Sequence, residues 1–408
     1  MRILMISDVF FPRINGVSTS IETFRHALAT EGVRSTLIAP AYPGAAPDDD
    51  PDIVRIPSRY LPMDPEDRLM RRGAIRALLP ELRGRGIDLV HVHTPFAAHY
   101  AGLEIARALG VPCVATYHTF FEEYLFHYVP VLPRPWLRSA ARRFSRSQCN
   151  ALDAVIVPST AMADILRGYG VTRPLHVLPT GLPARQFVGG DGCFFRSRYG
   201  IDKDRRLLLF VGRVAHEKNI DFLIDVIEHL KHSQPKALLL ITGEGPALAS
   251  LTAAVQQRAL SEHVRFLGYL DRNSELHDCY RAADLFVFAS RTETQGLVLL
   301  EAMALGTPVV ALAELGTRDI LGRQLGCRIA PADAKAFSAI VADLLDDPPR
   351  LKALAVEAHR YARTWAAEEM ARKLALLYRG WAHPAQRLLD DLEVAPAPAG
   401  RPAASGTR

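Results

Sequence analysis

The chain has 408 residues, of which 49% are apolar and 23% are charged. This is an ordinary globular balance, which excludes collagen-like, coiled-coil and wholly disordered proteins, and the length indicates two or three domains. The 49 basic and 44 acidic residues leave a net charge of +5, a surplus too small to predict nucleic acid as a partner.

Other features of the composition bear on the cellular compartment. No run of 18 or more uncharged apolar residues occurs, so no transmembrane helix is expected. Asp8 interrupts the apolar start of the chain and no small-residue cleavage site follows, so a secretory signal is not expected. The five cysteines form no Cys-x-x-Cys pair, which predicts a reducing cytoplasm and no structural zinc.

In the first half, short apolar runs alternate with helical stretches. Strands are expected at residues 2–7, 35–39, 89–93, 113–117 and 154–158. Helices are expected at 17–31 and 98–109, the second ending at a glycine and a proline. Strands that alternate with helices predict right-handed crossovers and a parallel sheet.

The same alternation starts again after residue 205. Strands are expected at 207–212, 237–242, 264–267, 285–289 and 309–312, with helices at 219–232, 247–259, 274–282 and 296–305. Further helices are expected at 334–345, 349–363 and 367–381. The fold class is therefore α/β, with two doubly wound Rossmann-like domains.

These patterns divide the chain into five parts. The first domain covers residues 1–180, a glycine-rich linker 181–204, and the second domain 205–363. Residues 364–382 are expected to form a helix that crosses back to the first domain. The Ala/Pro/Gly-rich residues 383–408 are expected to be a disordered tail.

Open α/β sheets bind ligands beyond the carboxyl ends of their strands, so site residues are expected in the loops that follow strands. Gly16 opens the helix after the first strand, where free backbone N–H groups can bind a phosphate or a sugar. Arg213 and Lys218 follow strand 207–212 and suit a diphosphate, although solvated surface cations are the alternative. His118 follows strand 113–117, where it can hydrogen-bond a substrate hydroxyl or serve the structure.

The segment 290–302 carries two carboxylates around the start of a helix. Glu293 lies just before this helix, and the backbone N–H groups of 294–297 are expected to be unpaired there. Glu301 lies on an otherwise apolar helix with no cation beside it in the sequence, and such a carboxylate needs a partner. The paired hydroxyls of a nucleotide sugar are suitable partners; otherwise Glu293 is a favourable anion at a helix start and Glu301 an exposed helix residue.

Two other segments give negative signals. Gly243-Glu244-Gly245-Pro246 begins like a dinucleotide-binding loop, but Leu248 occupies the position of its third glycine, so a nicotinamide site is not expected. The run Asp48-Asp49-Asp50 follows no expected strand, so an acidic surface loop is favoured over a metal site.

A basic stretch in the first domain has the pattern of an interfacial helix. Residues 124–152 contain five arginines and no acidic residue. Arg138, Arg142 and Arg146 recur every four positions, with Trp136 nearby, which is typical of a helix that lies on an anionic membrane. A second basic patch is expected at 68–76. A solvated helix face is the alternative.

Taken together, these segments resemble glycosyltransferase family 4, the retaining enzymes of GT-B architecture, over residues 1–381. The resemblance rests on Asn15-Gly16-Val17, on Gly212-Arg213 with Glu217-Lys218, and on Glu293 followed by Glu301. Its motifs are in the family's order, each at the expected strand end.

A narrower resemblance is to the bacterial diacylglycerol glycosyltransferases. It rests on Thr116-Tyr117-His118-Thr119 with Glu122 and Tyr124, on Pro179-Thr180-Gly181, and on 292–296. Family members more often carry Asn in place of Thr180 and Phe in place of Gln295. Their common Gly-Gly after the last core strand is reduced here to Gly316.

The resemblance implies two domains across a deep cleft, a nucleotide-diphosphate sugar donor (UDP in this branch) on the second domain, and an acceptor on the first. It implies no cofactor and no catalytic metal. Arg213 and Lys218 would stabilise the charge of the leaving diphosphate, and a phosphate oxygen would take the acceptor's proton. Glu293 and His118 would contact the transferred sugar, Glu301 the ribose and Gly16 the diphosphate.

The predicted catalytic residues are Arg213, Lys218, Glu293 and His118. The predicted donor-binding residues are Gly16, Arg213, Lys218, Glu293, Thr294, Gln295, Gly296, Leu297 and Glu301. The predicted acceptor or membrane residues are Tyr117, Glu122, Trp136, Arg138, Arg142 and Arg146.

The favoured interpretation is a retaining glycosyltransferase that acts on a membrane lipid, diacylglycerol, in glycolipid synthesis. It would work in the cytoplasm as a peripheral protein on the inner face of the cell membrane. One alternative keeps the donor chemistry but gives it a soluble or polysaccharide acceptor. A second alternative is a sugar-nucleotide-binding protein without turnover, which the intact Arg213, Lys218, Glu293 and Glu301 disfavour.

Overall fold

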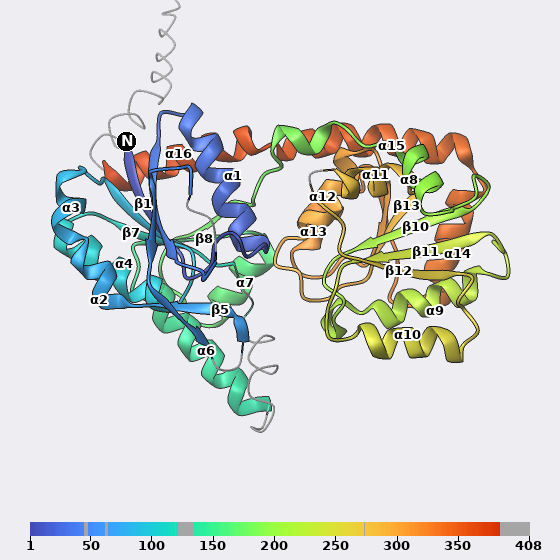
Figure 1. Cartoon of the computed structure of the whole chain (residues 1–408), viewed down its shortest axis with the longest axis horizontal. Helices are drawn as coiled ribbons and strands as arrows, with labels where there is room; N and C mark the ends of the chain where they lie inside the picture. The colour runs from blue at the N-terminus through green and yellow to red at the C-terminus, as the bar shows by residue number, and fades with distance from the viewer. Residues whose placement is uncertain (45–47, 62–63, 119, 121–133, 273, 384–408) are drawn as a thin grey trace, which may run out of the picture.

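The structure is a computed structural model that describes residues 1–44, 48–61, 64–118, 120, 134–272 and 274–383 (Figure 1). It contains a seven-stranded parallel sheet in the order β3-β2-β1-β6-β7-β8-β9 and a six-stranded parallel sheet in the order β12-β11-β10-β13-β14-β15. The α/β class with two doubly wound sheets, predicted from the alternating pattern, is confirmed.

The first sheet is built from the N-terminal part of the chain. Its strands are β1 (Arg2–Ile6), β2 (Arg34–Pro40), β3 (Ile53–Ile56), β6 (Leu89–Val92), β7 (Cys113–Thr116), β8 (Ala154–Val157) and β9 (Leu175–Val177). Its helices are α1 (Gly16–Thr30), α2 (Arg72–Ala77), α3 (Leu79–Gly84), α4 (Ala97–Leu109), α6 (Arg134–Asn150) and α7 (Thr160–Gly168). A separate antiparallel hairpin pairs β4 (Ser58–Leu61) with β5 (Asp64–Met70).

Strand β1 shows why this sheet is apolar on both faces. Leu4 and Ile6 pack into one core with α4 and α7, whereas Ile3 and Met5 pack into another core on the opposite face. A parallel strand covered on both sides carries a continuous apolar run instead of an alternating one.

The second sheet repeats this construction. Its strands are β10 (Arg206–Val211), β11 (Ala237–Thr242), β12 (Val264–Gly268), β13 (Leu285–Phe288), β14 (Val309–Ala311) and β15 (Cys327–Ile329). Its helices are α9 (Ile220–Leu230), α10 (Leu248–Gln257), α11 (Glu275–Ala282), α12 (Leu297–Ala304), α13 (Thr317–Leu321), α14 (Ala334–Leu345) and α15 (Pro348–Ala362). The 3₁₀ turns are η1 (Ala184–Phe187), η2 (His216–Lys218) and η3 (Arg363–Trp365).

Helix α16 (Ala367–Ala382) follows the second sheet in sequence but packs on the first. Met370, Leu374 and Tyr378 lie in the same core as Ile3, and Figure 1 shows α16 running beside α1. The two crossing segments meet at Leu182, whose N–H donates to Trp365 and whose carbonyl accepts from Ala367.

Several elements were not predicted. They include the strands β3, β9 and β15, the β4–β5 hairpin, the helices α2, α3, α7 and α13, and helix α8 (Gly192–Arg198), which lies within the stretch expected to be a linker. These strands are short, and β5 begins with an acidic, proline-containing sequence that has no strand signal.

Three of the four arginines in the second basic patch expected at 68–76 are held by partners within the domain. Arg68 is buried, and its guanidinium lies 3.8 Å from the ring centre of Tyr60 and 5.4 Å from that of Tyr42. Arg72 and Arg76 both pair with Glu104. These three cations are therefore held by aromatic rings and a carboxylate, and they do not form an unpaired basic surface.

Candidate functional site

The carboxyl ends of the two sheets face each other. Thr294, in the loop after β13, donates its hydroxyl to the carbonyl of His118 after β7 at 3.2 Å. The Thr294 carbonyl accepts from the hydroxyl of Ser159, which follows β8, at 2.8 Å. On α13, Asp319 accepts from the backbone and hydroxyl of Thr160. The loops predicted to hold a donor are thus placed against the first domain.

Lys218 and Glu293 form an ion pair at this junction. Lys218 Nζ lies 2.5 Å from Glu293 Oε1, and each side chain is about one-fifth exposed. Lys218 ends the turn η2, after which Asn219 starts α9 with a left-handed φ of 56°. Arg213 is exposed in the preceding loop. The sequence predicted that Lys218 and Glu293 both bind the donor, but it did not predict that the two side chains pair with each other.

Glu301 is buried on α12 and has two protein partners. Its carboxylate accepts from the guanidinium of Arg272 and, at 3.1 Å, from the hydroxyl of Tyr280. The Glu301 carboxylate raises the pKa of Arg272. No cation lies beside Glu301 in the sequence, but in the fold Arg272 reaches it from 29 positions earlier. Glu301 thus has no unmet need for a partner, and its contact with ribose stays a prediction.

The backbone around Glu293 is closely packed. Gly296 adopts a φ of +96° before α12 begins. A side chain at Gly316 would place its Cβ 2.1 Å from the carbonyl oxygen of Thr294. Of the two glycines common in the family, this chain therefore keeps the one that close packing against Thr294 requires. Leu315, where the family more often has glycine, adopts a φ of +45°, which is strained for a leucine.

Gln295 is buried between the two domains. It bonds to both backbone groups of Thr180, while the Thr180 hydroxyl bonds to Ser20 on α1 at 2.7 Å. Gly16 starts α1 and is exposed, and a Cβ added to it would meet no atom within 4 Å. Asn15 caps this helix by accepting from the backbone of Ser18.

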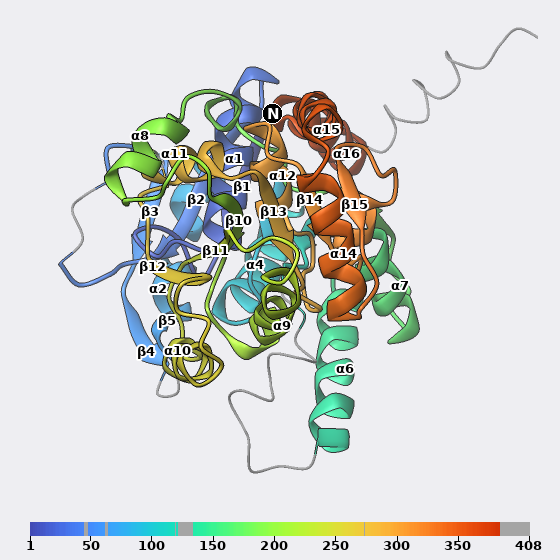
Figure 2. The same cartoon turned by 90° about the vertical axis from the view of Figure 1, so that its right-hand side faces the viewer.

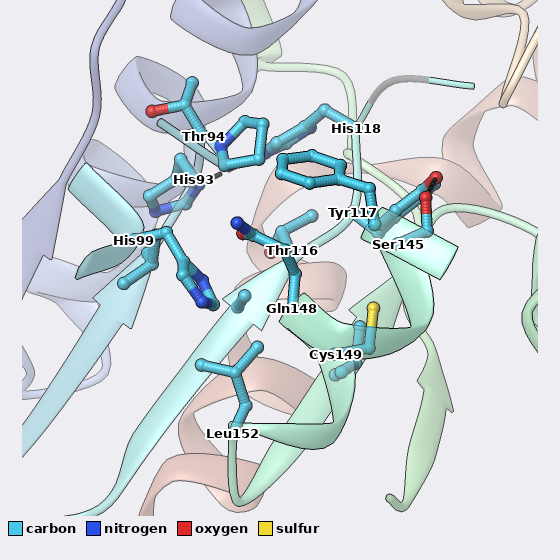
Figure 3. Close-up of a pocket in the computed structure, with 15 residues that line it drawn as sticks. His93, Thr94, His99, Thr116, Tyr117, His118, Ser145, Gln148, Cys149 and Leu152 are labelled. Atoms are coloured by element: carbon cyan, nitrogen blue, oxygen red, sulfur yellow. Dashed lines mark hydrogen bonds between the residues drawn. The ribbon is translucent and has the colours of Figure 1, made fainter. Parts of the chain in front are cut away.

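His91 on β6 lies beside His93 and His118, which follow β6 and β7 and are labelled in Figure 3. The His93 Nδ1 lies 3.1 Å from the His118 Nε2, so one ring donates to the other. The centre of the His91 ring lies 4.1 Å from that of His93, with the two rings tilted by 37°, and His91 also hydrogen-bonds to Tyr378 and Thr116. Burial lowers the pKa of His118 to about 4 and that of His91 to about 3. These rings are neutral at pH 7.

The predicted acceptor and membrane residues fall into three groups. Tyr117 is buried, and its hydroxyl bonds to Ser145 on α6 at 2.8 Å. Trp136 is 73% exposed, and Arg138, Arg142 and Arg146 are exposed on α6. Glu122 lies outside the described residues, as does Tyr124.

Helix α6 extends away from the rest of the molecule in two perpendicular views (Figures 1 and 2). Its Arg142 lies 5.5 Å from the ring centre of Tyr169, so this guanidinium also packs against the domain. Within the described part of the chain, no helix has both the length and the apolarity to span a membrane. Nor do the described residues bring three or more His, Cys, Asp or Glu side chains into a metal-binding group.

Comparison with known proteins gives this architecture its class. Residues 14–186 match the family described as Glycosyltransferase Family 4, and residues 194–365 match Glycosyl transferases group 1. The structure superposes on a sucrose-phosphate synthase from Thermosynechococcus elongatus with a TM-score of 0.74 at 21% identity, covering 96% of this chain and 99% of the other. The fold is therefore GT-B.

Curated relatives agree with that class. The chain is 33% identical to an alpha-monoglucosyldiacylglycerol synthase of Streptococcus pneumoniae over 76% of this chain and 71% of the relative. It is 30% identical to a GDP-mannose-dependent alpha-mannosyltransferase of Mycobacterium tuberculosis over 79% and 81%. The chain belongs to glycosyltransferase family 4, and it is a retaining hexosyltransferase that uses a nucleotide-sugar donor.

Several residues of this junction were not predicted from the sequence. Arg272 lies in a loop and Asp319 on the short helix α13, both without a motif, and Ser159 is an ordinary helix cap. His93 had a usable signal, since it follows directly on a strand that ends at a ligand-binding edge.

Proposed function

We propose that this chain transfers a hexose, with retention, from a UDP-sugar to the hydroxyl group of diacylglycerol at the surface of an anionic membrane. The observation that carries the donor half is the Lys218–Glu293 ion pair at the junction of the two domains. The acceptor half is supported by the diacylglycerol synthases among the relatives and by the exposed cationic helix α6.

Catalysis of this transfer requires positive charge that is already in place beside the leaving diphosphate. When the anomeric bond breaks, negative charge grows on the diphosphate, and cations that are already in place lower the barrier. Lys218 and Arg213 supply that charge, and the free N–H groups at Gly16 add the positive end of α1. Glu293, which pairs with Lys218, accepts hydrogen bonds from hydroxyl groups of the transferred sugar. A phosphate oxygen takes the acceptor's proton, so no protein base is required.

The remaining donor contacts come from the loop after β13 and from α12. The backbone of 294–297 faces the sugar and phosphates, and Glu301 accepts from the ribose hydroxyls in place of part of its bonding to Arg272 and Tyr280. The His118 ring is neutral, so it hydrogen-bonds to a sugar hydroxyl without adding charge near the leaving nucleoside diphosphate.

The lipid side rests on α6. Trp136 is a large, exposed amphipathic side chain on a helix whose exposed surface carries Arg138, Arg142 and Arg146. A basic helix with an exposed aromatic residue suits the boundary between headgroups and acyl chains. Each cation near an anionic surface contributes about 1 kcal/mol of attraction.

A donor-by-acceptor matrix tests this function. UDP-glucose, UDP-galactose, UDP-glucuronic acid and GDP-mannose are each incubated with phosphatidylglycerol vesicles that contain dioleoylglycerol, phosphatidylinositol or no acceptor. A glycosyl-diacylglycerol made from a UDP-sugar, with EDTA present, is the expected product. No transfer to dioleoylglycerol from any donor contradicts the lipid assignment, and donor binding without any turnover contradicts the enzymatic one.

A further inference from the structure

A pocket lies beside the histidines in the first domain. It is formed by the ends of β6 and β7, the start of α4 and the inner face of α6 (Figure 3). Its walls are mainly apolar and include Val92, Pro95, Ala115, Phe144 and Leu152. His118, which follows β7 at the domain junction, also lines the pocket. The pocket therefore adjoins the place where the two domains meet.

Two residues that line this pocket each carry a buried polar atom with no hydrogen-bond partner among the described residues. These atoms are Nε2 of His93 and Oε1 of Gln148. His93 is 3% exposed and Gln148 is 8% exposed. The Nε2 atom of Gln148 donates to the hydroxyl of Tyr100 at 3.1 Å. This bond fixes the amide group so that its oxygen points away from Tyr100. Leaving such atoms unpaired costs about 1–3 kcal/mol each, so they indicate a hydrogen-bonding ligand.

The lining that the structure describes is electrically neutral. Burial lowers the pKa of His93 well below its usual value, and that of His99 and His118 to about 4. The other polar lining groups are hydroxyls, an amide and a thiol. A neutral hydroxyl group can enter these surroundings by donating to the Gln148 oxygen and bonding to the His93 nitrogen. A phosphate would lose its hydration without gaining a cation.

We propose that this pocket binds the neutral, hydroxyl-bearing end of the acceptor and excludes phosphorylated headgroups. The inference rests on the proposed function, because it names the acceptor chemistry of the same site. It separates a glycerol-type acceptor from a phosphorylated one, a distinction that matters because one relative is described as a D-inositol 3-phosphate glycosyltransferase.

The hydrogen bond between His93 and His118 links this pocket to the donor side. If His93 Nδ1 donates to His118 Nε2, then His93 Nε2 is an acceptor toward the pocket; in the other tautomer Nε2 is a donor. His93 is thus a positioning residue: the group bound in the pocket selects its tautomer, and that tautomer sets which proton His118 carries.

The test uses two lipids with the same acyl chains, dioctanoylglycerol and dioctanoyl phosphatidic acid. In wild-type protein with ¹⁵N-labelled histidine and bound UDP, dioctanoylglycerol should shift the His93 ring resonances, which His93→Asn identifies. Phosphatidic acid should not shift them. Equal shifts with both lipids, or none with dioctanoylglycerol, would overturn the proposal.

Kinetics give a second readout. Gln148→Leu should raise KM for dioctanoylglycerol at least tenfold with a smaller change in kcat, and Gln148→Glu should raise it further. Ser147→Glu places the same charge on the exposed side of α6 and should leave KM within twofold. An unchanged KM in Gln148→Leu, with UDP affinity and melting temperature like the wild type, contradicts the pocket assignment.

The two proposals fail separately. If wild type binds dioctanoylglycerol at His93 but never glycosylates it, the proposed function falls and the pocket stands. If wild type glycosylates diacylglycerol while Gln148→Leu keeps its KM, the pocket falls and the function stands.

Discussion

Gln295 bonds to both backbone groups of Thr180, accepting from its N–H at 2.8 Å and donating to its carbonyl at 2.7 Å. The two residues are 115 positions apart and belong to different domains. Both are positions at which this chain departs from the commoner family residues, and the structure shows that the two departures contact each other. Through Ser20, the same contact reaches α1.

Gln295→Leu should therefore destabilise the protein. Two buried backbone groups of Thr180 lose their partners, and each loss costs about 1–3 kcal/mol of unfolding free energy. Urea denaturation measures the loss, and Gln257→Leu on the exposed side of α10 serves as the control. Equal denaturation midpoints for Gln295→Leu and wild type would show that water replaces the amide at no cost.

Lys218→Ala should reduce kcat at saturating donor by roughly 100-fold or more, because a fixed charge at the leaving diphosphate is lost. In this variant Glu293 has also lost its ion-pair partner, so its carboxylate repels the negative diphosphate. Arg213→Ala should act in the same direction. Lys203→Ala, an exposed cation outside the site, is the matched control. Full kcat in Lys218→Ala would remove Lys218 from the chemistry.

Glu301→Gln should weaken UDP binding about 10- to 150-fold, as expected for a buried charged acceptor worth roughly 1.5–3 kcal/mol. Calorimetric titration with UDP provides the measurement. Arg272→Met separates the two roles of Glu301. If the carboxylate binds ribose directly, Arg272→Met should retain much of the affinity that Glu301→Gln loses. Equal losses in both variants would mean that Glu301 only holds Arg272.

Replacing Arg138, Arg142 and Arg146 by Glu should lower binding to anionic vesicles by at least two orders of magnitude, since three attractions of about 1 kcal/mol each become repulsions. The effect should shrink at high salt, because exposed charges are screened within about 8 Å at physiological ionic strength. UDP affinity should stay unchanged. Sedimentation with neutral and anionic vesicles tests this, and equal pelleting of both proteins returns α6 to a solvated face.

The free energy of unfolding should fall as pH drops from about 6.5 to 4. Burial lowers the pKa of His91 to about 3 and that of His99 and His118 to about 4, whereas unfolded histidine titrates near 6.5. In this window the unfolded chain binds protons that the folded chain refuses, so acid favours unfolding.

His99→Gln isolates one of these protons. The slope of unfolding free energy against pH should become shallower by about 1.4 kcal/mol per pH unit in this window. Urea titrations at several pH values measure the slope, and the exposed His232→Gln is the control. Parallel curves for wild type and His99→Gln would show that His99 is protonated in the folded protein too.

The sequence by itself determined the α/β architecture and the family. Buried parallel strands need continuous apolar runs, as in β10 and β11, and the loops after them carry the candidate ligand residues at fixed local spacings. Each of these local patterns lies within about a dozen residues. The sequence alone therefore identified Arg213, Lys218, Glu293 and Glu301 as candidate site residues.

Only the tertiary structure decided which of these residues meet. The Lys218–Glu293 pair, the reach of Arg272 to Glu301 and the bonds between Gln295 and Thr180 join residues that are 29 to 115 positions apart. The return of α16 to the first sheet and the pocket between β6, β7 and α6 likewise depend on how elements pack. Such contacts follow from how strands and helices pack within each domain and, for Gln295 and Thr180, from how the two domains meet, and no local spacing in the chain encodes that geometry.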